Sequence, residues 1–216
     1  SEDYDSGQEI DDAITGDFVE KDEKITDGVW NVRIIGVNAD RLLESVIKDK
    51  NPDYKIDLTN PPGKYKKIRM LVSDRVFMGF TRLKKNLIIS TKENSIIIRP
   101  GTVTTEDSNP LTGVKRRIDY EIVISLPENF KTDVKNMSFK KEVCSIEVGI
   151  SDLGYITTFD NLLKPLKLSV EYSEGSWYAN GKTFGYVYDK NTSAWQKLNT
   201  SASYNGDRRK GEVFIE

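Results

Sequence analysis

The chain is a succession of short β-branched and aromatic segments separated by turn residues, and this pattern limits its fold more than any other feature. Runs of about four to eight such residues, bounded by glycine, proline, asparagine or aspartate, predict β-strands. About a dozen runs of this kind follow the first 27 residues. They are 28–37, 67–72, 75–80, 86–91, 95–100, 117–126, 142–150, 154–159, 166–173, 176–179, 182–189, 193–198 and 212–216.

One segment has helical periodicity instead. Leu42, Leu43, Val46 and Ile47 recur at helical spacing and predict a helix over about 39–49. Residues 51–65, which contain three prolines, are predicted to form a loop. The expected fold is therefore mostly β, an antiparallel β-sandwich or jelly roll with one short helix.

Charge divides the chain into two parts. Residues 1–27 contain eleven acidic residues and two lysines, whereas the remainder contains 23 acidic and 30 basic residues. The sequence thus predicts an acidic N-terminal arm over 1–27 and a basic β domain over 28–216. A small C-terminal hairpin subdomain, beginning at about residue 173, is kept as an alternative within that domain.

The acidic arm buries too little apolar surface to order by itself. We therefore expect a second surface to order it, and we interpret the arm as a segment that docks on neighbouring subunits. Four apolar side chains are predicted to make that contact, namely Ile10, Ile14, Phe18 and Val19. The expected partners are copies of the same chain or other assembly proteins.

Several chemistries conflict with the residue content. The chain has no histidine and a single cysteine, which removes ordinary zinc sites and histidine-dependent triads. Cys144 alternates with Ile146 and Val148 and is predicted to be a buried strand residue. Paired carboxylates are the catalytic device left open, and the sequence nominates no pair. We predict a non-enzymatic protein without a cofactor or a metal.

Two short motifs resemble ligand sites but lack residues that those sites require. Gly181-Lys182-Thr183 ends like a phosphate-binding loop, but the first glycine is displaced and no helix pattern follows. Asn180-Gly181 predicts a tight β-hairpin turn instead. Residues 49–60 have calcium-loop spacings, yet Tyr54 replaces the required glycine. We predict a polar loop there.

Basic clusters near aromatic residues support a nucleic-acid-binding β-barrel as an alternative, which is not favoured. The candidate basic surface comprises Lys64, Lys66, Lys67, Arg69, Lys84, Lys85, Arg116, Arg117, Arg208 and Arg209. Aromatic residues near the C-terminus support another alternative, a carbohydrate- or ligand-binding module. The candidate aromatic surface comprises Trp177, Tyr186, Tyr188 and Trp195.

Gly28-Val29-Trp30, at the start of the first predicted strand, resembles the Gly-x-Trp opening of lipocalins. A helix pattern follows at once and the terminal helix of that family is missing, so the lipocalin pocket is not carried over. The favoured function is a structural or assembly protein, for example a virion coat or tail component. No signal peptide or membrane span is visible, which favours a virion or cytoplasmic location.

Overall fold

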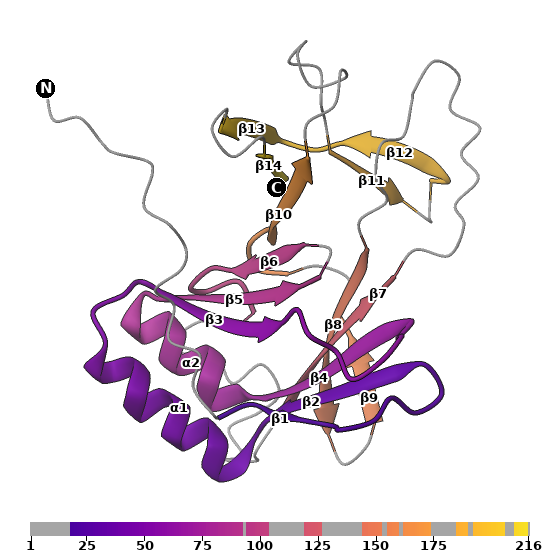
Figure 1. The fold of residues 1–216 in the computed structure, drawn as a ribbon. Helices are drawn as coiled ribbons and strands as arrows, with labels where there is room; N and C mark the ends of the chain where they lie inside the picture. The colour runs from indigo at the N-terminus through magenta and orange to yellow at the C-terminus, as the bar shows by residue number, and fades with distance from the viewer. Residues whose placement is uncertain are drawn as a thin grey trace, which may run out of the picture.

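The protein is described by a computed structural model, in which two six-stranded mixed β-sheets and two helices surround one core (Figure 1). The structure describes residues 18–92, 94–103, 119–126, 144–152, 155–159, 162–173, 185–189, 192–205 and 210–215. The prediction of a mostly β fold is confirmed. The sheets are mixed because two pairs of strands, one in each sheet, run parallel.

The first sheet, called sheet A, contains in spatial order β1 (Glu20–Lys21), β2 (Val29–Ile34), β4 (Lys67–Ser73), β7 (Asp119–Ser125), β8 (Ser145–Asp152) and β9 (Tyr155–Thr158). The second, called sheet B, contains β13 (Thr200–Asn205), β14 (Lys210–Ile215), β10 (Lys167–Ser173), β6 (Ser95–Ile98), β5 (Asn86–Thr91) and β3 (Asp53–Leu58). A separate pair joins β11 (Tyr186–Asp189) to β12 (Ala194–Lys197). Most predicted strands therefore appear, and β5 and β6 pair antiparallel as a hairpin.

The predicted helix is confirmed as α1 (Gly36–Lys48), which begins three residues earlier than expected. A second helix, α2 (Asp74–Leu83), corrects the prediction that residues 75–80 form a strand. Val76, Phe77 and Phe80 are its buried residues, and they share one helical face. A short apolar run fits either a strand or a buried helix, so periodicity alone did not separate the two.

β3 corrects a second prediction, because it lies within residues 51–65, which were expected to form a loop. Tyr54, Ile56 and Leu58 are buried and alternate with less buried residues, as in a strand with one face toward the core. The prolines lie at either side of β3 rather than within it. β13 was also missed by the sequence analysis.

The two helices belong to a structural repeat that the sequence did not reveal. The units β2–α1–β3 and β4–α2–β5 each start in sheet A and end in sheet B. Equivalent strands pair in parallel, with Val29 opposite Lys67 and Asp53 opposite Asn86. The helices differ in length, 13 against 10 residues, so the repeat has no constant period.

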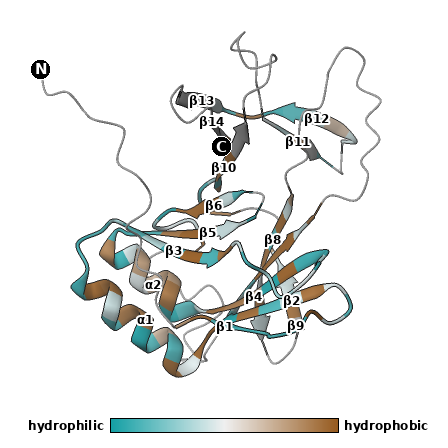
Figure 2. Cartoon of the chain, viewed as in Figure 1, coloured by the Kyte–Doolittle hydropathy of each residue, from teal (hydrophilic) through white to brown (hydrophobic). Residues whose placement is uncertain are grey.

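The core lies between the sheets and the helices. Trp30, Leu42, Ile56, Met70 and Ile122 are among its fully buried side chains. Figure 2 shows hydrophobic and hydrophilic residues interleaved along both helices, as expected where one face packs inward. Burying each large side chain contributes about 1.5–3 kcal/mol, so this core fixes sheet A firmly.

Candidate functional site

The C-terminal part of the acidic arm is built into sheet A. Thr26 and Val29 exchange backbone hydrogen bonds of 3.1 and 2.8 Å across Asp27-Gly28. Both central residues have positive φ angles, 52° and 76°, as a type I′ hairpin turn requires. The chain therefore reverses tightly, and β1 pairs with β2 of the same molecule, with Glu20 opposite Arg33.

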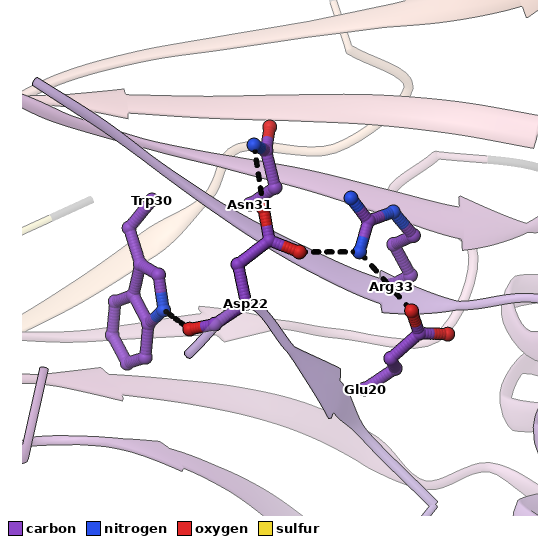
Figure 3. Close-up of polar contacts among 5 residues, drawn as sticks. All are labelled: Glu20, Asp22, Trp30, Asn31 and Arg33. Carbon is purple, nitrogen blue, oxygen red and sulfur yellow. Dashed lines mark hydrogen bonds and ion pairs between the residues drawn. The ribbon is translucent and has the colours of Figure 1, made fainter. Parts of the chain in front are cut away.

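A polar network, called the Asp22 cluster (Glu20, Asp22, Asn31 and Arg33), fixes this reversal (Figure 3). Arg33 Nη1 donates to Asp22 Oδ1 at 2.7 Å and to Glu20 Oε1 at 3.2 Å. Asn31 Nδ2 donates to Asp22 Oδ2 at 2.9 Å. The buried Trp30 adds a bond from its Nε1 to the Asp22 carbonyl oxygen at 3.1 Å. Both carboxylate oxygens of Asp22 are thus satisfied.

These bonds change the acidity of the cluster. The hydrogen bond from Arg33, followed by that from Asn31, lowers the pKa of Asp22 below its usual range. The hydrogen bond to Asp22 raises the pKa of Arg33 in turn. The ionised pair is therefore the stable state at neutral pH, and it holds the arm against sheet A.

Apolar contacts act in the same direction. Phe18, Val19 and Ile25 are partly buried against the core. The sequence analysis assigned Phe18 and Val19 to a contact between subunits, whereas here they pack on their own chain. Ile10 and Ile14, the other predicted contact residues, lie outside the described residues. The arm thus divides into residues 18–27, which belong to the fold, and residues 1–17.

Only some residues of the predicted basic surface are exposed without an ion pair among the described residues. Lys64, Lys66 and Lys67, called the lysine cluster, are exposed, and Lys66 lies beside Gly28 of the Asp27-Gly28 turn. The backbone N–H groups of Lys66 and Lys67 both donate to the Gly28 carbonyl oxygen, at 2.8 and 3.2 Å. Within the described part of the chain, none of the three ammonium groups makes an ion pair. The lysine cluster therefore presents cationic charge that no described acidic residue neutralises.

Other predicted basic residues already have structural roles. Arg69 donates from Nε and Nη2 to Glu121 Oε2, at 2.8 and 2.7 Å. Lys85 is only 7% exposed, and its ammonium donates to the carbonyl oxygens of Asp49 and Asn51. Its prediction as a surface residue is therefore not supported.

Only one of the remaining predicted basic residues is among those that the structure describes. Lys84 is exposed and ends α2 in a left-handed conformation. Arg116, Arg117, Arg208 and Arg209 lie outside the described residues.

An open groove of about 390 Å³ crosses the face of sheet A that points away from the core. The residues that line it, called the outer groove, are Val29, Lys67, Arg69, Glu121, Val123, Glu147, Gly149, Ile156 and Thr158. Glu121 is 5% exposed and neutralised by Arg69, whereas Glu147 is exposed. Lys67 and Glu147 therefore leave one accessible charge of each sign in a groove with apolar walls.

The predicted aromatic surface falls on β11 and β12. Tyr188 lies directly opposite Trp195 in this pair of strands, and Tyr186 lies opposite Lys197. Tyr186 and Trp195 are half-buried. Trp177 and the predicted turn at Asn180-Gly181 lie outside the described residues, so the carbohydrate-binding arrangement stays a prediction.

The remaining candidates have local structural explanations. In the loop with calcium-like spacing, Asp49 Oδ1 accepts from the Asn51 N–H and Asn51 Oδ1 accepts from the Asp53 N–H, both at 2.9 Å. Cys144 is half-buried beside the core, 3.6 Å from Asn94 Nδ2. Among the described residues, no group of three or more histidine, cysteine or acidic side chains could hold a metal ion. Neither described helix is long and apolar enough to cross a membrane.

Comparison of the chain with protein-family models, with curated proteins and with solved structures finds no match. The lipocalin resemblance therefore gains no support from these comparisons. The sequence analysis missed the Asp22 cluster and the outer groove. Asp27-Gly28 was the available signal for the first, since Asp-Gly between apolar segments is typical of a type I′ hairpin.

Proposed function

We propose that this chain is a non-enzymatic structural or assembly protein whose acidic residues 1–17 dock on a neighbouring subunit. A virion coat or tail component is the particular form we propose. The observation that carries the proposal is the Asp22 cluster, which fixes residues 18–27, here called the root of the arm, at the edge of sheet A. Residues 1–17, which precede this root, contain seven acidic residues and no basic residue.

The lysine cluster supplies a complementary surface for such a segment. Its three ammonium groups are exposed and make no ion pair within the described residues. Lys67 lies opposite Val29 at the start of β2, whereas Glu20 lies opposite Arg33 near its end. The arm therefore leaves the sheet at the end of β2 remote from its own lysine cluster.

Deletion of residues 1–17 tests this function, because it leaves residues 18–27 and the fold intact. In sedimentation velocity at low salt, at the lowest concentration at which the full chain forms oligomers, we expect the truncated chain to be monomeric. A full-length control with the seven acidic residues changed to asparagine or glutamine should behave like the truncated chain. Oligomers should also dissociate near 1 M salt, where the Debye length falls to about 3 Å.

The lysine cluster is the proposed surface on which the arm docks. A chain with Lys64→Ser, Lys66→Ser and Lys67→Ser should therefore also lose the oligomers. The matched control is Lys84→Ser, which removes an exposed lysine at the end of α2. An intact chain that stays monomeric at all concentrations and salt conditions would contradict the proposed function. So would oligomers that persist unchanged after the deletion.

Nucleic-acid binding is a weaker alternative, because Arg69 is bound by Glu121 and Lys85 is buried. Binding of a labelled single-stranded oligonucleotide, measured by fluorescence anisotropy, distinguishes it from assembly. That alternative expects affinity to fall steeply with salt and to rise when residues 1–17 are deleted.

A further inference from the structure

β9 is an edge strand of sheet A, and it has an uncharged sequence, Tyr-Ile-Thr-Thr. β8 is its neighbour on one side, and no described strand pairs with it on the other. Ile156 is 46% exposed and, with Thr158, lines the outer groove. An exposed edge without charge, proline or bulge is a template for pairing with another strand.

The direction of its backbone groups follows from the register with β8. The N–H of Phe159 donates to the carbonyl oxygen of Val148 at 2.8 Å. Bonded residues alternate along an antiparallel pair, so residues 155, 157 and 159 point their backbone groups toward β8. The N–H and C=O groups of Ile156 and Thr158 consequently point away from the sheet, toward its free edge.

Two of the other edge strands, β1 in sheet A and β3 in sheet B, are protected. β1 is two residues long and carries Glu20 and Lys21. β3 carries alternating charges, and the ammonium of Lys21 binds the carbonyl oxygen of Asp57 at 2.7 Å. Short edges, charged edges and occupied edge carbonyls are the devices by which proteins prevent strand addition. β9 has none of these apart from its limited length. β13, at the edge of sheet B, also has an uncharged sequence and is the rival edge.

We propose that β9 pairs antiparallel with β9 of a second copy, around a two-fold axis at Thr157. In this register Ile156 of one copy lies opposite Thr158 of the other, and the two exchange backbone hydrogen bonds. Thr157 lies opposite its own equivalent as a non-hydrogen-bonded pair. The register is self-complementary because the outward-facing residues are symmetric about Thr157, so two sheets A would form one continuous sheet.

The observations favour a second copy over the acidic arm as the occupant of this edge. Glu147 is exposed on the same face and makes no ion pair among the described residues. The outer groove contains two acidic and two basic residues, so it offers no net attraction to a segment with seven acidic residues. An uncharged strand, by contrast, meets its own copy without repulsion. This contact is distinct from arm docking and does not depend on the proposed function.

Cysteine cross-linking tests the register directly. In a chain with Cys144→Ala, we expect Thr157→Cys to form a disulfide-linked dimer in a glutathione buffer, read by non-reducing electrophoresis and mass spectrometry. Facing residues of a non-hydrogen-bonded pair have Cα atoms about 4.5 Å apart, within disulfide range. The control Thr158→Cys is also exposed but faces residue 156, so it should remain largely monomeric. Equal dimer yields from the two variants, or no dimer from Thr157→Cys, would overturn the register.

Sedimentation velocity on a chain that lacks residues 1–17 separates this contact from arm docking. Four-residue strands bury little surface, so we expect a weak dimer that forms as concentration rises. Ile156→Lys should weaken it at least tenfold, whereas Ile156→Val should leave it unchanged. Ser201→Lys on β13 tests the rival edge. The proposal is wrong if the truncated chain stays monomeric, or if only Ser201→Lys abolishes the dimer.

Discussion

The two edge strands of sheet A, β1 and β9, differ in how far their contacts protect them from pairing with another strand. At one edge, β1 is short and charged, and the Asp22 cluster ties it to β2 through bonds of 2.7–3.2 Å. At the other edge, β9 is uncharged, and Ile156 is nearly half exposed. The first edge is closed by contacts within the chain, whereas no described strand pairs with the outward backbone groups of the second. The difference suggests that stability resides in the first edge and association in the second.

The largest expected effect comes from truncating Trp30, the buried β2 residue that binds β1 at Asp22, compared with a truncation on β9. Trp30 is 1% exposed and donates to the Asp22 carbonyl oxygen, so Trp30→Ala should destabilise the fold by about 3–5 kcal/mol. Ile156→Ala at the β9 edge should change the free energy of unfolding by no more than about 0.5 kcal/mol. Urea denaturation followed by circular dichroism measures both. Similar losses at the two edges would remove the contrast between them.

A smaller effect is expected midway between the edges, at the pair of Arg69 and Glu121. The side chain of Glu121 is 6% exposed and that of Arg69 is 41% exposed. Arg69→Leu leaves a buried carboxylate without its cation and should cost about 2–3 kcal/mol. Glu121→Gln leaves the more exposed guanidinium in contact with water and should cost about 1 kcal/mol. A double-mutant cycle in urea tests this asymmetry, and equal costs would contradict it.

The smallest expected effect depends on pH and concerns the β1 edge alone. The folded-state pKa of Asp22 is lowered by Arg33, so its ionised form stabilises the fold above the usual Asp pKa of about 3.9. This contribution is lost as pH falls through the lowered pKa. Asp22→Asn should therefore cost about 0.5–1 kcal/mol at pH 7 and progressively less below pH 4 or so.

Thermal unfolding of wild type and Asp22→Asn across this pH range measures the difference. Thr158→Asn on β9, where no titrating group is lost, is the control and should give a constant difference from wild type. A difference between Asp22→Asn and wild type that persists unchanged in acid would show that the carboxylate charge does not stabilise the β1 edge.

Sequence patterns predicted the elements of the site unevenly. The alternation in residues 117–126 and 142–150 correctly predicted β7 and β8, which form the floor of the outer groove. The bond between Arg69 and Glu121 joins residues 52 positions apart, and no local pattern indicates it. Lys85 was predicted to belong to a basic surface, whereas its ammonium donates to the carbonyl oxygens of Asp49 and Asn51.

The sequence by itself determined the mostly β composition, the position of α1 and the division into an acidic segment and a basic body, because periodicity and charge are properties of neighbouring residues. Only the tertiary structure decided that residues 75–80 are helical, that residues 18–27 belong to sheet A, and that Arg69 is neutralised. Each of these depends on which distant surface a segment packs against. The local sequence of a short apolar run or a single charged residue is the same whether it packs in the core, contacts a partner or faces solvent. Local patterns therefore do not separate these cases.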